Sequence, residues 1–180
     1  MPKTLQRGST IHTGRPLAER LGYSQEVLDA LPTQCVESFA GVGNPFLLWE
    51  IRPPGESMVD VGSGAGFDSL VAGRIVGPEA SVIGVDMTPE MLRKAWYNAQ
   101  LMNSSSVTFC KGLADKLPIP DASADVVIRN GLINLMPDKV GAVSEIFRVL
   151  VPGGRVYLAD IVVHKEVPDS ARQEVDLWTD

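Results

Sequence analysis

The chain has 180 residues, of which 44% are hydrophobic and 21% are charged, and its formal net charge is −6. This length and apolar content suit one compact domain with a sizeable core, and they exclude wholesale disorder. An acidic chain without a lysine or arginine cluster is a poor candidate for binding nucleic acid or a membrane surface. No apolar run approaches the roughly 20 residues of a membrane-spanning helix.

The first ten residues lack the apolar segment of a signal peptide. The two cysteines, Cys35 and Cys110, form no CxxC pair and cannot make a disulfide framework. We therefore expect a reduced, cytoplasmic protein, and no metal site is predicted.

Short helical patterns fill the first fifty-odd residues and cover 15–22, 24–31, 33–40 and 47–51. The segment GVGNPF, at 41–46, interrupts them with glycine and proline. We interpret residues 1–52 as a helical cap on the domain that follows, not as a separate domain. The segment RPPGE, at 52–56, is interpreted as the hinge.

Residues 53–180 alternate apolar strands with helices. The expected strands cover 57–62, 80–86, 106–112, 124–130 and 155–163. Helices are expected at 66–77, at 89–102, and from Pro137 or Asp138 until PGG at 152–154. Strands rich in valine and isoleucine, separated by such helices, predict an α/β fold with a doubly wound, mostly parallel sheet of five strands covered on both faces.

Two of these helices show an apolar face. In the helix at 89–102 this face consists of Met91, Leu92, Ala95, Ala99 and Met102. In the last helix the apolar stripe consists of Val140, Val143, Ile146, Phe147 and Leu150. We expect both faces to pack against the sheet.

The first strand of this domain runs into the segment VDVGSGAGFD, at 59–68. Its three glycines allow a ligand to approach the backbone closely, and free N–H groups are expected where the following helix starts. A glycine turn alone is a weak signal, because a turn without a ligand can have the same composition. Asp86, which ends the next strand, stands where an acid accepts hydrogen bonds from ribose hydroxyls.

Two further residues, Phe67 and Asp60, restrict the class of ligand that this turn could bind. Phe67 stands where the dinucleotide fingerprint has a third glycine, so no pyrophosphate is expected there. Asp60 lies inside the strand before the turn, where its charge would attract an ammonium and repel phosphates. Alternatively, backbone amides satisfy its carboxylate. The combination indicates S-adenosylmethionine, which has an amino-acid end, a ribose, an adenine and a sulfonium cation.

The segments VDVGSGAGFD, GVDMTPEML, GLADKLP, RNGLINLMPDK and EIFRVLVPGGRVYLADIV resemble the successive motifs of class I S-adenosylmethionine-dependent methyltransferases. More narrowly, GVGNPF, VIGVDMTPEM and NGLINLMPDK resemble arsenite methyltransferases, and the resemblance runs from about Leu21 to Asp180. It implies a Rossmann-like enzyme that uses S-adenosylmethionine and releases S-adenosylhomocysteine.

The resemblance also implies roles for single residues. Asp60 and the Gly62–Gly66 turn would hold the methionine end of the cofactor, and Asp86 would hold the ribose. The adenine would be flanked by Met87, Leu113 and Ala114, with Asp115 at its amino group. Asn130 would lie near the methyl group. The whole cofactor-binding set is Asp60, Gly62, Ser63, Gly64, Gly66, Phe67, Asp68, Asp86, Met87, Leu113, Ala114, Asn130 and Gly131.

The acceptor site departs from the arsenite methyltransferase pattern. Those enzymes bind trivalent arsenic through cysteine thiolates, and one of these lies in a GCGNP segment that here has Val42 instead. Another would come at about the end of this sequence. Candidate acceptor-binding residues are therefore Val42, Asn44 and Cys35. No base is evident near the strand ends, which suits a soft acceptor because it needs little base.

Three functions remain open at this point. The first is transfer of a methyl group to a small soft acceptor such as trivalent arsenic. The second is transfer to a small organic acceptor, and the third is a fragment that binds the cofactor without turnover. The full class I fold adds two strands after the fifth, so we expect an incomplete C-terminal part and a homodimer through the uncovered sheet edge.

Overall fold

A computed structural model describes residues 13–48, 55–131, 136 and 138–161 of the chain. The cap holds α1 (Arg15–Arg20), α2 (Gln25–Asp29), α3 (Thr33–Glu37) and the 3₁₀ helix η1 (Pro45–Leu48). The sheet domain follows with β1 (Ser57–Val61), α4 (Phe67–Val76), β2 (Ser81–Asp86), α5 (Pro89–Leu101), β3 (Val107–Lys111), β4 (Ala124–Asn130), α6 (Lys139–Val149) and β5 (Leu150–Ala159). No helix within these described ranges is long and apolar enough to cross a bilayer.

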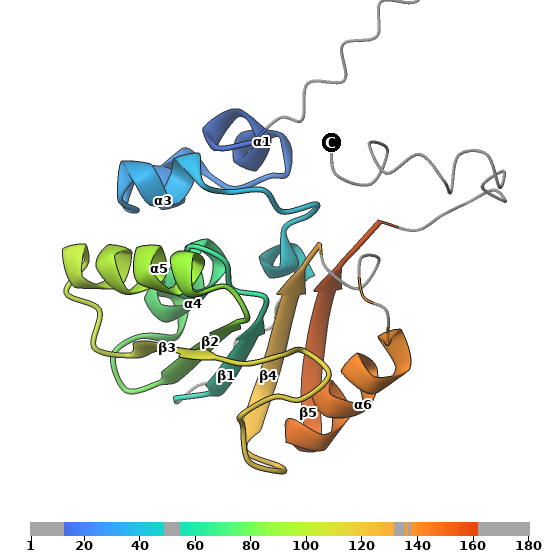
Figure 1. The fold of residues 1–180 in the computed structure, drawn as a ribbon. Coiled ribbons are helices and arrows are strands. Elements are labelled where there is room, and N and C mark those ends of the chain that lie inside the picture. Colours follow the sequence, from blue (N-terminus) through green and yellow to red (C-terminus); the bar gives the residue numbers. More distant parts are fainter. Residues whose placement is uncertain (1–12, 49–54, 132–135, 137, 162–180) are drawn as a thin grey trace, which may run out of the picture.

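The five strands form one parallel sheet in the order β3-β2-β1-β4-β5 (Figure 1). The α/β prediction with five parallel strands is thus confirmed. β1 pairs on one side with β2 and on the other with β4, so the strand order reverses beside β1. In sheets of this type the crevice beyond the carboxyl ends at such a reversal is the usual ligand site.

Helices cover the sheet on both faces. On one face, α4 and α5 pack on the sheet through a cluster that includes Leu70, Ala95 and Val126. On the other face, α6 packs on it through a second cluster that includes Ile146 and Val127. Strands that are buried on both faces explain why β1 and β4 are nearly continuous apolar runs.

The cap lies beyond the carboxyl ends of the strands, where the arrows of β4 and β5 end in Figure 1. Its aromatic side chains pack against the start of α4: the ring of Phe67 lies 5.0 Å from that of Tyr23 and 4.3 Å from that of Phe39. Cap and sheet therefore share one apolar cluster. The boundary at residue 52 stays a prediction. In the segment interpreted as a hinge, Glu56 is buried and forms an ion pair with Arg155.

Several predicted helix ends are confirmed. Gly77, with a φ of +83°, caps the C-terminus of α4, and Pro89 occupies the first turn of α5. The Thr88 side chain makes no capping bond, although Thr88 is the N-cap. The Asp138 side chain caps α6 by accepting a hydrogen bond of 2.8 Å from the Gly141 N–H.

The apolar stripe predicted for α6 is confirmed at Ile146 and wrong at Val140, Val143 and Phe147. The structure buries the stripe of Ala142, Ile146 and Val149. Val140 and Phe147 are instead 77% and 82% exposed, and Val143 is exposed as well. Because α6 carries apolar residues on more than one side, its periodicity could not show which side faces the sheet. Among the described residues, Val140, Val143 and Phe147 form an exposed apolar surface on α6.

The predicted boundary between α6 and the fifth strand also needs correction. The helix ends at Val149, before the PGG segment, and β5 starts at once with Leu150. Leu150 pairs with Ala124, the register then shifts across 152–154, and Arg155 pairs with Val126. The strand ends at Ala159, whereas the prediction extended it to 163.

Candidate active site

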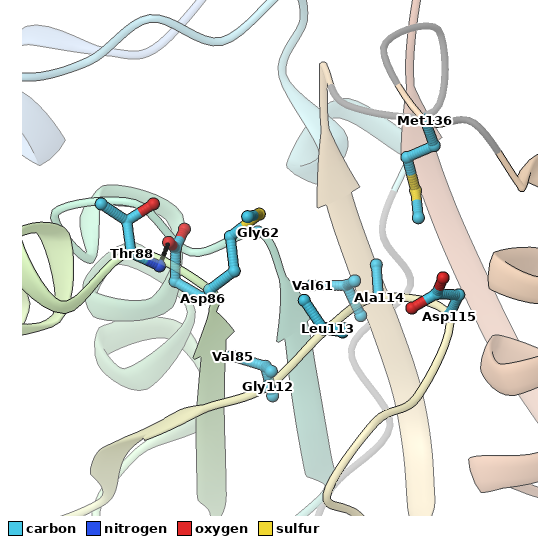
Figure 2. Close-up of a pocket in the computed structure, with 11 residues that line it drawn as sticks. Val61, Gly62, Val85, Asp86, Thr88, Gly112, Leu113, Ala114, Asp115 and Met136 are labelled. Carbon is cyan, nitrogen blue, oxygen red and sulfur yellow. Dashed lines mark hydrogen bonds between the residues drawn. The ribbon is translucent and has the colours of Figure 1, made fainter.

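A cavity of about 380 Å³ opens at the carboxyl ends of β1 and β2. It is lined by Val61, Gly62, Val85, Asp86, Met87, Thr88, Gly112, Leu113, Ala114, Asp115 and Met136. Figure 2 shows Asp86 and Thr88 on one side of the drawn residues and Asp115 and Met136 on the other. The Met87 side chain is 62% exposed in this setting. The mainly apolar walls and the size suit a small ligand with a flat apolar part.

The carboxylate of Asp86 is held in a fixed position at this cavity. Its Oδ2 accepts a hydrogen bond of 2.9 Å from the Gly64 N–H, and its Oδ1 accepts one of 2.8 Å from the Thr88 N–H. An ionised carboxylate oxygen can accept more than one bond. Asp86 therefore connects the glycine turn to the start of α5. Its carboxylate can still accept hydrogen bonds from the hydroxyl groups of a ligand in the cavity.

The glycine turn does not offer the free N–H groups that we expected at most of its positions. The N–H groups of Gly62 and Ser63 donate to the Val85 carbonyl, at 2.8 and 3.0 Å, and the Gly66 N–H donates to the Ser63 carbonyl. With Gly64 bonded to Asp86, four N–H groups are used inside the protein. The Ser63 hydroxyl, in contrast, is buried and has no hydrogen-bond partner among the described residues.

Two carboxylates, Asp60 and Asp68, are buried beneath this turn. Asp60 accepts a hydrogen bond of 2.6 Å from the Ser69 hydroxyl. Asp68 accepts one of 2.5 Å from the Tyr23 hydroxyl and one of 3.0 Å from Nδ2 of Asn130. Within the described ranges, no lysine or arginine forms an ion pair with either acid.

Burial is the largest cause of the raised pKa values of Asp60 and Asp68. It raises the pKa of Asp60 to about 8, and the charge of Asp68 adds to the rise. Burial likewise raises the pKa of Asp68 to about 6, although the bonds from Tyr23 and Asn130 oppose that rise. Two buried carboxylates that lack a basic partner favour a positively charged ligand, because such a ligand would offset the cost of ionising them.

Asn130 lies at the end of β4, but its amide is bonded mainly to the cap. Its Oδ1 accepts hydrogen bonds from the N–H groups of Val42 and Gly43, at 2.8 and 3.0 Å, and its Nδ2 donates to the Gly43 carbonyl at 2.8 Å. Val42 also lies over Gly131: a Cβ placed on Gly131 would be 3.1 Å from Cγ1 of Val42. Asn44, in the same loop, accepts a bond of 3.0 Å from the Phe46 N–H.

Neither cysteine has the environment of a metal-binding thiolate. Cys35 is fully buried, with its Sγ 3.9 Å from the Ala65 carbonyl oxygen of the glycine turn, and burial raises its pKa to about 12. Burial also raises the pKa of Cys110 on β3. Among the described residues, no group of three or more His, Cys, Asp and Glu side chains could hold a metal ion.

The structure adds residues that we had not predicted for the site: Val61, Val85, Thr88, Gly112 and Met136 line the cavity, and Tyr23 bonds to Asp68. Tyr23 lies between two short cap helices, where no local motif marks it, and it reaches Asp68 only through tertiary packing. Met136 lies in the NLMPDK segment, whose resemblance could have indicated it. Pro137, which was one of the two expected starts of the last helix, lies outside the described ranges.

Comparisons with known proteins agree with this geometry. A family model for a methyltransferase domain matches residues 53–179. The arsenite methyltransferase of Halobacterium salinarum is 41% identical over 162 residues, which are 90% of this chain and 41% of that protein. Human arsenite methyltransferase is 31% identical over 97% of this chain and 47% of its own length.

A solved methyltransferase structure is similar to this chain as well. The arsenic(III) S-adenosylmethionine methyltransferase of Chlamydomonas reinhardtii superposes with a TM-score of 0.76 at 37% identity. The match covers 85% of this chain and 53% of that one. The chain therefore spans about half, or less, of the length of these similar proteins.

Proposed function

Since the chain belongs to the methyltransferase domain family, we propose that it transfers a methyl group to a small soft acceptor such as trivalent arsenic. Its cofactor is S-adenosylmethionine, as the family match and the similar solved structure support. When bound, this cofactor supplies a methyl group already activated on a sulfonium. The protein's task is then to position the two reactants and exclude water.

The buried pair of Asp60 and Asp68 is the observation that best supports donor binding. The cofactor carries an ammonium and a sulfonium, which suit two carboxylates without a basic partner in the described structure. The cavity supplies the remaining contacts that we propose. Asp86 would accept hydrogen bonds from the ribose hydroxyls, and Met87 and Leu113 would pack on the adenine.

Similarity to arsenite methyltransferases supports arsenic as the acceptor, and a soft nucleophile would need no strong base. A second candidate is a small organic acceptor. Val42 favours it, because a valine packed over Gly131 offers an apolar surface where the arsenite methyltransferase pattern has a cysteine. The burial of Cys35 favours it too, since this thiol cannot readily replace the missing one.

Calorimetric titration tests the donor site. We expect S-adenosylmethionine to bind and NAD not to bind. Asp86→Ala should weaken binding by about 1–3 kcal/mol through loss of a hydrogen bond to a charged group. Asp121→Ala is the control, because this acid lies on the surface at the Arg148 ion pair, away from the cavity. Binding of NAD instead, or equal affinities of Asp86→Ala and wild type, would contradict the donor site.

Methyl transfer from labelled cofactor tests the acceptor. Arsenite with glutathione should yield labelled methylarsenic if arsenic is the acceptor, and Val42→Cys should then raise the rate by adding a soft ligand. Val42→Ser is the matched control, because serine is close to cysteine in size but lacks sulfur. If arsenite gives no product while small organic thiols or amines are labelled, the second candidate is correct.

A further inference from the structure

One hydrogen-bonded network joins the cap to the sheet above the donor site. The Tyr23 hydroxyl donates to Oδ1 of Asp68 at 2.5 Å, and Nδ2 of Asn130 donates to Oδ2 of the same carboxylate at 3.0 Å. Oδ1 of Asn130 in turn accepts from the N–H groups of Val42 and Gly43. Tyr23 and Asn130, which are far apart in sequence, thus meet at a single buried carboxylate on α4, and Asn130 connects the cap loop at 41–43 to it.

The cap loop at 41–43 approaches the strand ends closely enough that only glycine fits at two positions. A Cβ on Gly41 would lie 2.4 Å from Nδ2 of Asn130, and one on Gly43 would lie 2.5 Å from Cβ of Ala159 at the end of β5. Tyr23 is buried among Phe39, Phe46 and Phe67, with ring centres 5.3, 6.2 and 5.0 Å away. The cap is therefore docked by shape and by this polar network.

The strength of the network depends on the charge of Asp68. Hydrogen bonds to an ionised carboxylate are about twice as strong as those between neutral groups. The two donors to Asp68, Tyr23 and Asn130, are neutral, and the neighbouring Asp60 is another acid. A cation bound beneath the glycine turn would favour the ionised form of Asp68 and so strengthen the bonds from Tyr23 and Asn130.

We propose that Tyr23 is a positioning residue that couples docking of the cap loop to occupation of the donor site. This inference rests on the proposed function, since the cation in question belongs to S-adenosylmethionine. Coupling of this kind is reciprocal: the donor tightens the cap, and a docked cap tightens the donor. S-adenosylhomocysteine keeps the ammonium but has lost the sulfonium charge, so it tightens the cap less and the product is released more easily.

Hydrogen exchange of the wild-type chain tests the coupling directly. The amides of Val42 and Gly43 report cap docking, because both donate to Asn130. Their exchange should slow several-fold when S-adenosylmethionine binds and should slow less with saturating S-adenosylhomocysteine. Equal protection by the two ligands, or no change with either, would overturn the coupling even if both ligands bind.

Tyr23→Phe removes only the hydroxyl and keeps the ring in its aromatic cluster. We expect a loss of S-adenosylmethionine affinity of about 10- to 150-fold, the range that one hydrogen bond to a charged group supports. The ligand-induced protection of Val42 and Gly43 should also be lost. Tyr97→Phe, on the exposed side of α5, is the control and should change neither readout.

A pH series separates positioning from simple packing. The groups that act on Asp68 are the Tyr23 and Asn130 donors, and Asp68 itself acts on Asp60 and Cys35, while Asp86 acts on Asp60. The bond from Tyr23 lowers the pKa of Asp68, so Tyr23→Phe should move the rise of donor affinity to higher pH. An unchanged pH profile and unchanged affinity would overturn the role of Tyr23. Failure of the wild type to bind S-adenosylmethionine would instead overturn the proposed function.

Discussion

At the scale of single residues, burial disfavours the ionised form of the Asp60 carboxyl group. Its pKa in the folded chain is raised to about 8, whereas an unfolded aspartate titrates near 3.9. Between these values the folded state binds more protons than the unfolded state. The contribution of Asp60 to the free energy of unfolding of the ligand-free chain should therefore fall as pH rises from about 4 to about 8.

Asp60→Asn should flatten this pH dependence. The slope from one such group is at most about 1.4 kcal/mol per pH unit, and an uncharged amide removes its contribution. Urea unfolding at several pH values between 4.5 and 8.5 measures the slope. The exposed acid Asp29, replaced by Asn, is the control. If Asp60→Asn and wild type share one slope, Asp60 does not titrate in this range.

Arg129 is a second buried charge, on the face of the sheet opposite Asn130 and at the same end of β4. Its side chain is fully buried, and its Nε and Nη1 have no hydrogen-bond partner among the described residues. Within the described ranges its Nη2 donates to the sulfur of Met136, at 2.9 Å, and burial lowers its pKa although the charge of Asp160 acts in the opposite direction.

Arg129→Met should therefore stabilise the chain by about 1–3 kcal/mol, because an apolar side chain of similar length removes a poorly satisfied charge. Thermal and urea unfolding measure the effect. Arg93→Met, on the exposed surface of α5, should change stability by less than about 0.5 kcal/mol. A destabilised Arg129→Met variant would mean that the guanidinium has a favourable partner that outweighs its desolvation.

At the scale of elements, the glycine turn between β1 and α4 depends on two different properties of glycine. Gly64 and Gly66 both have left-handed backbone angles, with φ of +52° and +88°. A Cβ on Gly64 would meet nothing within 4 Å. One on Gly66 would be 2.8 Å from the Phe109 ring and 3.2 Å from Cβ of Ala95, so Gly66 also lets β3 and α5 pack against the turn.

Gly66→Ala should consequently cost more stability than Gly64→Ala. Backbone strain alone costs about 1–2 kcal/mol at either position. At Gly66 the clash with Phe109 adds a further loss of about 1–3 kcal/mol, as overpacking does in other cores. Urea unfolding of both variants measures the difference. Equal losses would show that Phe109 moves aside without cost.

At the scale of the whole molecule, β5 is the last strand of the described sheet, and the apolar residues Val140, Val143 and Phe147 are exposed on α6. Exposed strand edges and apolar patches favour association. We propose a homodimer through this surface. Sedimentation should show a dimer that Phe147→Glu dissociates, whereas Leu101→Glu on α5 should not. A monomeric wild-type chain at high micromolar concentration would contradict the proposal.

Much of the fold was predictable because its signals are local. The apolar runs at 57–61, 81–86 and 124–130, and stop residues such as Gly77, need only neighbouring residues to act. The cavity was predictable for a related reason. Gly62, Asp86 and Leu113 all lie at carboxyl ends of parallel strands, and such ends meet at one edge of a sheet. The exposed side of α6 was not predictable, since several of its sides are apolar.

The sequence by itself determined the α/β fold, the order of its elements and, through the glycine turn and Asp86, the edge of the sheet where the cavity opens. Only the tertiary structure decided which hydrogen bonds form between the cap and this edge of the sheet. The sequence put Asn130 beside the donor, but its amide holds the loop at 41–43, and Cys35 lies beneath the turn. Tyr23 had no local signal. Its role exists only because apolar packing brings the cap to within hydrogen-bond distance of Asp68, 45 residues away in the chain.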